Sequence, residues 1–174
     1  PLHAFDLSQI KDEKVFVRKS LKNEKIETLD GQLRSLPKDT IVIADMDTPI
    51  GLAGIMGGKN SEIKINTSSI FLEAANFNPK NIRSTSRKLG LFTEASMRFE
   101  RNLKPDITEY ALSRAVDLII DIAGGKIRDG MQDIYRDKIT STQRIILNKD
   151  KMRLHLGLNI DNEKISKTLS YLDF

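Results

Sequence analysis

The sequence predicts a mixed α/β protein of the α+β kind, in which a layered β-sheet or sandwich carries two main helices packed against it. Short apolar runs separated by turn residues fill the first 75 residues, as in a protein built from short strands. Two helical patterns follow, over residues 79–89 and 106–123. A polar stretch and a last amphipathic pattern then indicate the start of a second small domain.

Apolar content and turn residues predict the strands. The pair Asp30-Gly31 closes one of them as a turn. Residues 40–44 and 49–56 are continuous apolar runs, which fit strands buried on both faces, whereas residues 63–67 alternate and should be half-exposed. Six segments have this composition of short strands: 15–17, 25–29, 40–44, 49–56, 63–67 and 70–75.

Signals at their ends predict the helices. Asn78 suits the position that caps a helix, Pro79 suits the first helical position, and Gly90 suits the end. Over residues 106–123 apolar side chains recur at spacings of three and four, and a glycine pair follows. We therefore expect one helix to end at about residue 89 and a longer one to end at about residue 123.

The pattern divides the chain into a domain over 1–135, a linker over 136–141 and the start of a further domain over 142–174. The linker is polar and has no apolar period. The tail combines a strand at 145–147 with two short helices, the second capped by Asp161. Because the first residue is not methionine and the last helix stops abruptly, we expect a segment of a longer protein.

Composition excludes several classes of site. Among 174 residues there is no cysteine, so disulfides, thiolate metal sites and cysteine nucleophiles are excluded. The two histidines, His3 and His155, lie far apart in sequence, and we expect no metal site. No apolar run approaches the roughly 20 residues that span a bilayer, and no signal peptide is recognisable. We expect a cytoplasmic protein that does not bind a membrane.

The net charge of +4 permits a nucleic-acid partner without requiring one. On the helix predicted over 79–89, Arg83 and Arg87 lie one turn apart with Lys88 beside them, so the three cations share one face. Such a face is more often a solvated surface than a nucleic-acid contact. We expect Phe92 and Phe99 to lie in the core and not to stack on bases.

Residues 53–60 (AGIMGGKN) look at first like a phosphate-binding P-loop. Two positions depart from that motif, because Ala53 replaces the leading glycine and Asn60 replaces the hydroxyl that binds magnesium. We therefore reject nucleotide binding here. A tight glycine turn remains, whose bare backbone lets a ligand approach its amides. A simple hairpin turn is the alternative, and the spacing alone favours it.

Glu73 is a lone carboxylate at the end of an apolar strand, followed by two alanines that leave room beside it. This arrangement suits a pocket that admits a ligand and inspects one polar group on it. A strand-end glutamate that reaches water is an equally supported alternative. Thr93 and Ser96 carry hydroxyl groups just before a helix, with no histidine nearby in sequence, so capping is favoured over covalent catalysis.

Five separated motifs together resemble the editing module of the bacterial phenylalanyl-tRNA synthetase β subunit. Their order matches that family over about residues 1–135, and the tail from about residue 141 is similar to the start of the next module. Several motifs in the right order are far more specific than any one of them. The motifs are residues 1–6 (PLHAFD), 52–58 (LAGIMGG), 71–75 (FLEAA), 93–96 (TEAS) and 98–101 (RFER).

The resemblance implies a function and a role for each matching residue. The module would hydrolyse Tyr-tRNA, with Glu73 recognising the tyrosyl hydroxyl group and Ala95 forming the pocket floor. The remaining residues would surround the ester and its attacking water: His3, Gly54, Gly57 and Thr93. The family's site also uses residues upstream of Pro1.

The resemblance implies partners too, namely the tRNA for phenylalanine and the α subunit of a heterotetramer. ATP and magnesium would serve the complete synthetase, whose aminoacylation site lies outside this segment, and we expect no cofactor within the segment. The alternative is a non-catalytic tRNA-binding or structural module. The basic face of Arg83, Arg87 and Lys88 favours that alternative, whereas Glu73 and Thr93 oppose it.

Overall fold

The computed structural model describes residues 1–128, 130–134, 145–172 and 174, which divide into two units. The first unit, Pro1–Ile134, contains all the strands found in the described residues. The described part of the second unit, Tyr135–Phe174, contains two helices. The linker predicted over 136–141 lies outside the described residues.

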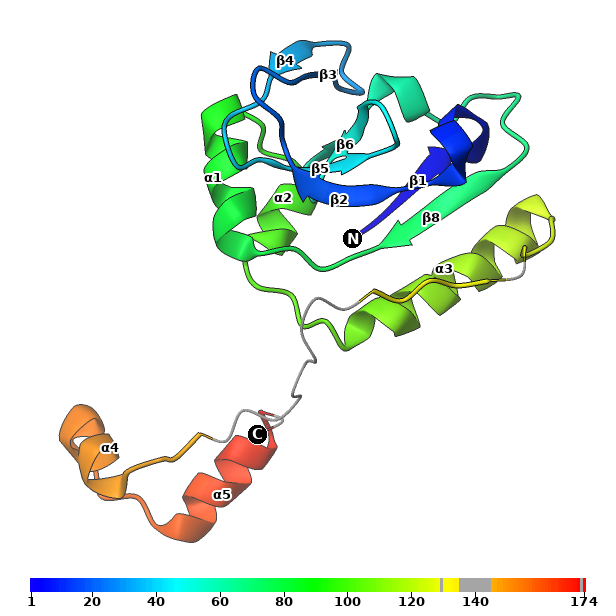
Figure 1. The fold of residues 1–174 in the computed structure, drawn as a ribbon. Coiled ribbons are helices and arrows are strands. Elements are labelled where there is room, and N and C mark those ends of the chain that lie inside the picture. The colour runs from blue at the N-terminus through cyan, green and yellow to red at the C-terminus, as the bar shows by residue number, and fades with distance from the viewer. Residues whose placement is uncertain (129, 135–144, 173) are drawn as a thin grey trace. The chain divides into compact units, whose positions relative to one another are not determined.

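Three antiparallel sheets and three α-helices, with short 3₁₀ helices between strands, make up the described residues of the first unit (Figure 1). Four strands pair in the order β2-β5-β6-β7, and two further pairs are β1-β8 and β3-β4. This architecture confirms the α+β class. The strands are β1 (Leu2–Asp6), β2 (Phe16–Lys19), β3 (Lys25–Glu27), β4 (Leu33–Ser35), β5 (Ile41–Ala44), β6 (Pro49–Leu52), β7 (Met56–Gly57) and β8 (Ile70–Ala74).

The apolar run at 40–44 forms β5, which lies between β2 and β6, so the predicted buried strand is confirmed. The run at 49–56, predicted as a single strand, is instead a hairpin of β6 and β7. Gly54 has a φ angle of +66° in the turn that joins them. This left-handed conformation is easy for glycine and costly for other residues, which explains why the run reverses there.

The strand predicted at 63–67 is wrong. The chain instead forms a short 3₁₀ helix, Lys59–Ser61, and then a turn in which the Ile65 side chain is fully exposed. The Thr67 hydroxyl group donates a hydrogen bond to Asp6 at 2.6 Å. An alternating pattern does not produce a strand unless a neighbouring strand pairs with it, and none of the described strands pairs with this segment. The hydrogen bond from Thr67 to Asp6 holds the segment in its turn instead.

Helix α1 (Pro79–Leu89) begins and ends where the sequence predicts. The Asn78 side chain accepts a hydrogen bond from the Asn81 amide at 3.1 Å, and Gly90 ends the helix with a φ angle of +66°. On its inner face Ile82 is 1% exposed. The short helix α2 (Glu94–Phe99) follows, and Figure 1 shows it next to α1.

Helix α3 (Ile107–Ala123) confirms the longest predicted helix and lies along β8 (Figure 1). None of its side chains is fully buried, so its packing against the unit is partial. On its outer surface Tyr110 and Ile122 are largely exposed. Within the described residues, no helix combines the length and the apolar content needed to cross a membrane.

The second unit contains α4 (Lys149–Leu156) and α5 (Asn162–Ser170), which match the two short helices predicted in the tail. Asp161 caps α5 through a hydrogen bond from the Lys164 amide, as expected. The strand predicted at 145–147 is wrong, because these residues form no regular element and are exposed. The described part of this unit offers them no strand to pair with.

The core of the first unit generates a stability prediction at Ile82. Replacing Ile82 with alanine should lower the free energy of unfolding by about 2–5 kcal/mol, since the side chain is enclosed and its removal leaves a cavity. Urea denaturation of the chain measures the change. The adjacent substitution Arg83→Ala is the matched control, because Arg83 is exposed and should change stability by no more than about 0.5 kcal/mol. Equal losses in both variants would contradict this packing.

Candidate functional site

Two candidate residues, far apart in sequence, face each other across a strand pair. In the antiparallel pairing of β1 with β8, His3 lies opposite Glu73 and Phe5 lies opposite Phe71. Direct partners in such a pair share one face of the sheet, with Cβ atoms roughly 4.5–5.5 Å apart. The rings of Phe5 and Phe71 agree with this geometry, because their centroids are 6.0 Å apart.

This shared face lies against the β6–β7 hairpin. The His3 ring packs edge-on against Phe5, with centroids 4.5 Å apart. It also covers Gly57, where an added Cβ atom would lie 2.5 Å from the His3 Nε2 atom. Gly57 therefore provides the space that the imidazole occupies. Glu73, the direct partner of His3 in the strand pair, lies on the same face as His3.

The Glu73 carboxyl group is half-buried and has no partner. Among the described residues, no side chain or amide donates a hydrogen bond to it, and none forms an ion pair with it. Burial raises the pKa of Glu73 from 4.5 to about 7. Part of the side chain stays accessible to solvent, so a ligand can reach the group, yet enough protein surrounds it to make its charge costly.

Burial also lowers the pKa of His3. Its imidazole is therefore neutral near pH 7, with one nitrogen able to donate a hydrogen bond and the other able to accept one. The site thus combines a neutral imidazole with a carboxyl group that titrates near neutrality, on adjacent strands. Perturbed pairs of this kind are typical of functional sites, although structural pairs occur as well.

The sequence suggests that the backbone at Gly54 is open to a ligand, but core side chains lie against one side of it. An added Cβ atom at Gly54 would lie 2.9 Å from Phe99, 3.0 Å from Phe77 and 3.2 Å from Ile82. Aromatic and aliphatic core side chains therefore occupy that side of the turn. A ligand could approach Gly54 only from its other side, through its peptide groups.

The Thr93 hydroxyl group connects this turn to α2. It donates a hydrogen bond to the Ile55 carbonyl oxygen at 2.8 Å and accepts one from the Ser96 amide at 3.1 Å. The Ser96 side chain in turn accepts from the Thr93 amide, which completes a capping box. With its proton already donated to Ile55, Thr93 is suited to holding the turn and not to nucleophilic attack. Capping by Thr93 and Ser96 is confirmed.

Ala95 lies in the first turn of α2, partly buried against the core. The structure thus brings His3 against Gly57 and opposite Glu73, and it joins the turn at Gly54 to Thr93 through Ile55. Two of these contacts were not predicted from the sequence. They are the hydrogen bond from Thr93 to the Ile55 carbonyl oxygen and the packing of the His3 ring over Gly57. The only signal for them was the position of Gly57 inside an apolar run.

The basic side chains of α1 lie on the surface. Arg83, Arg87 and Lys88 are all exposed, and none forms an ion pair with any residue that the structure describes. Of the two phenylalanines expected in the core, Phe99 is buried but Phe92 is 68% exposed, so the expectation for Phe92 is wrong. The reason is local, since the neighbouring Leu91 is the side chain that turns inward.

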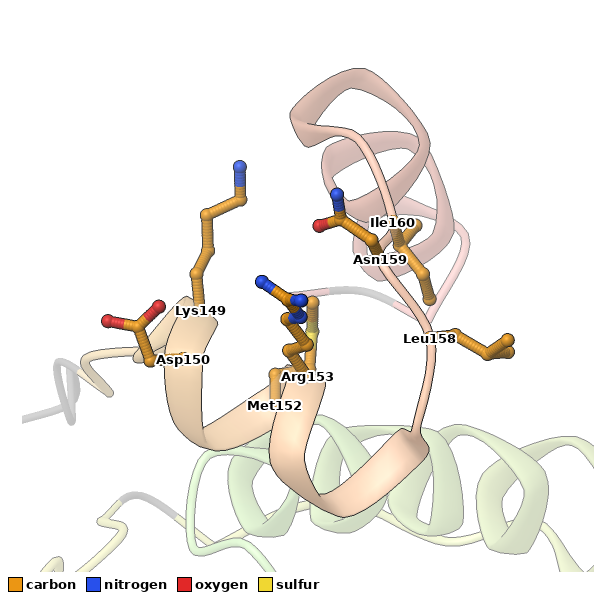
Figure 2. A pocket seen from close by; sticks show the side chains of 7 residues that line it. All are labelled: Lys149, Asp150, Met152, Arg153, Leu158, Asn159 and Ile160. Atoms are coloured by element: carbon orange, nitrogen blue, oxygen red, sulfur yellow. The ribbon is translucent and has the colours of Figure 1, made fainter.

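A separate hollow lies in the second unit and includes none of the candidate residues. Figure 2 shows it between α4 and the loop before α5, with the polar ends of Lys149, Arg153 and Asn159 directed to one side and Leu158 pointing away. Nothing about its lining indicates chemistry. Across the described ranges, no three His, Asp or Glu side chains gather as a metal site would require.

Comparison with known proteins identifies similar sequences. The family description that matches residues 1–124 is the B3/4 domain. The phenylalanine–tRNA ligase beta subunit of Carboxydothermus hydrogenoformans is 42% identical over 174 residues, which cover 100% of this chain and 22% of that protein. The subunit of the same name from Aquifex aeolicus is 43% identical over 173 residues, 99% of this chain and 22% of that protein. The chain therefore spans about a fifth of the length of these relatives.

The raised pKa of Glu73 predicts a pH-dependent gain in stability on substitution by glutamine. The folded chain holds the Glu73 proton more tightly than the unfolded chain, so the free energy of unfolding falls as pH rises from 4.5 to about 7 and stays reduced above. Glu73→Gln removes this cost. The variant should gain at most about 3 kcal/mol near pH 8 and little near pH 4.5.

Urea denaturation at the two pH values measures this gain. The substitution Glu100→Gln, at an exposed glutamate after α2, is the control and should behave like the unsubstituted chain at both. A Glu73→Gln gain of the same size at both pH values would exclude buried charge as its cause.

Proposed function

This chain belongs to the B3/4 domain family, and from that premise we propose that it carries an editing site that hydrolyses Tyr-tRNA made in error by a phenylalanine–tRNA ligase. In this proposal the chain is a segment of the ligase β subunit and forms no part of the aminoacylation site. The observation that carries the proposal is the half-buried carboxyl group of Glu73, which has no partner among the described residues.

A ligase for phenylalanine needs such a site because tyrosine differs from phenylalanine by one hydroxyl group. A hydrophobic pocket rejects an isostere with an added hydroxyl group only about a hundredfold. A second, hydrolytic site can require the tyrosyl hydroxyl group for binding, whereas the aminoacylation pocket only fails to exclude it. Errors are then removed after they are made.

Glu73 can recognise this hydroxyl group. An ionised carboxylate accepts a hydrogen bond from the tyrosyl phenol, whereas a phenylalanine ring leaves the charge unpaired at a cost of about 1–3 kcal/mol. A phenol donor also favours the charged form of Glu73, so its binding should lower the pKa of the group from about 7. The small side chain of Ala95 would leave space for the ring.

The other site residues suggest how the ester is hydrolysed. His3, which is neutral near pH 7, can orient a water molecule toward the ester carbonyl carbon. The Gly54 amide has no acceptor among the described residues and could donate to the developing oxyanion. Gly57 leaves room for His3, and Thr93 holds the turn. The remaining assistance would come from the terminal ribose hydroxyl group of the tRNA.

The proposal includes the partners of the complete enzyme. These are the tRNA for phenylalanine and the α subunit of a heterotetramer, with ATP and magnesium used in aminoacylation elsewhere in the cytoplasmic synthetase. The exposed cations Arg83, Arg87 and Lys88 would contact the tRNA backbone.

The competing function is a non-catalytic tRNA-binding or structural module. The exposed basic face of α1 supports it, because that face requires no chemistry. The unpaired Glu73 opposes it, because a scaffold gains nothing from a carboxyl group that is costly to bury. Hydrolysis of Tyr-tRNA compared with Phe-tRNA by the complete ligase separates the two, since a scaffold hydrolyses neither.

Replacing Glu73 with alanine in the complete ligase should slow the clearance of Tyr-tRNA by about 5- to 150-fold, as expected for the loss of one buried hydrogen bond worth about 1–3 kcal/mol. Aminoacylation with phenylalanine should stay nearly unchanged. The control is Glu109→Ala, an exposed glutamate on α3. Unchanged clearance by the Glu73 variant would remove this residue from recognition.

Replacing Ala95 with tryptophan should abolish clearance of Tyr-tRNA because the indole fills the space proposed for the tyrosyl ring. A deacylation assay measures this loss, and retained aminoacylation with phenylalanine shows that the ligase is folded. Clearance at the original rate would mean that the tyrosyl pocket lies elsewhere.

A further inference from the structure

Phe92 is an exposed aromatic side chain beside the proposed editing site. It is 68% exposed, while Leu91 before it is only 7% exposed. A single exposed phenylalanine is not unusual in itself. Its position is informative, because it lies between Gly90, which ends α1, and Thr93, which caps α2.

The backbone holds Phe92 close to the basic end of α1. The Gly90 amide donates to the Arg87 carbonyl oxygen at 3.2 Å, and the Leu91 amide donates to the Ser86 carbonyl oxygen at 2.9 Å. These bonds fold the chain back against the last turn of the helix, which carries Arg87 and Lys88. An aromatic ring and two cations are therefore exposed at the junction of α1 and α2.

Thr93 connects this junction to the site. Its hydroxyl group donates to the Ile55 carbonyl oxygen in the turn of the hairpin whose second strand contains Gly57. The His3 ring covers Gly57 and lies opposite Glu73. Phe92 therefore immediately precedes Thr93, the residue that holds the turn between β6 and β7 beside the site.

We propose that Phe92 stacks on the unpaired base of the terminal nucleotide of the tRNA, while Arg87 and Lys88 neutralise the phosphates that precede it. The inference rests on the proposed function, since it is the ester on the terminal ribose that would bring this base beside the site. Exposed aromatic rings with neighbouring cations bind single-stranded nucleic acid by stacking and by charge.

The surroundings of Phe92 favour RNA over an apolar protein surface. Exposed residues of the two helix ends that flank it in sequence are charged, with Arg87 and Lys88 at the end of α1 and Glu94 and Arg98 paired on α2. A protein interface would need several apolar side chains around the ring, and the nearest exposed one on α2 is Met97, at 38%. A base needs only the face of one ring.

A fluorescent base tests the contact without relying on hydrolysis. The complete ligase is mixed with tRNA whose terminal adenine is replaced by 2-aminopurine, which loses emission when it stacks. We expect quenching by the unsubstituted ligase and by Phe92→Tyr, and much weaker quenching by Phe92→Ala. The control is Phe16→Ala, which removes a 44% exposed phenylalanine from β2 and should leave quenching intact. Equal quenching by Phe92→Ala and the unsubstituted ligase would overturn the proposal.

Kinetics provide a second test. Phe92→Ala should raise the KM for Tyr-tRNA hydrolysis by about 5- to 150-fold with little change in kcat, and it should have no effect on Tyr-tRNA whose terminal ribose lacks its base. An equal effect on both substrates would overturn the stacking. If the unsubstituted ligase hydrolyses no Tyr-tRNA, the proposed function fails, and the fluorescence experiment still decides the role of Phe92.

Discussion

The pairing of β1 with β8 is the constraint on which the site depends. It joins residues 70 positions apart in the chain and sets His3 opposite Glu73 on one face. That register brings an acid into a layer where no described group compensates its charge, and burial consequently raises the pKa of Glu73 to about 7. A slip of one residue in the pairing would put His3 and Glu73 on opposite faces of the sheet.

Two glycines and one hydroxyl group then build the remainder of the site around this pair. Gly57 admits the His3 ring, Gly54 permits the reversal between β6 and β7, and Thr93 ties that reversal to α2. These contacts leave Glu73 as the uncompensated group. The raised pKa means that burial of the charged Glu73 carboxyl group costs the folded chain stability above pH 7.

Local signals made much of the fold predictable, whereas the site needed long-range information. Asn78 and Gly90 delimit α1 because caps act on adjacent backbone groups. Residues 63–67 alternate like a strand but pair with no strand that the structure describes, so the periodicity misled there. Glu73 was identifiable from its apolar surroundings, yet its position opposite His3 and the solvent exposure of Phe92 follow from pairing and packing that no local pattern contains.

The environment of Gly54 means that the candidate site and the packed core share residues in this chain. A Cβ atom at this position would lie 3.0 Å from Phe77 and 2.9 Å from Phe99, and both rings belong to the packed interior. A slightly smaller or larger side chain at either position would shift the hairpin that supports His3. The packed interior therefore helps to set the shape of the candidate site, so a replacement at Phe77 or Phe99 can alter the environment of His3 without changing any residue of the site itself.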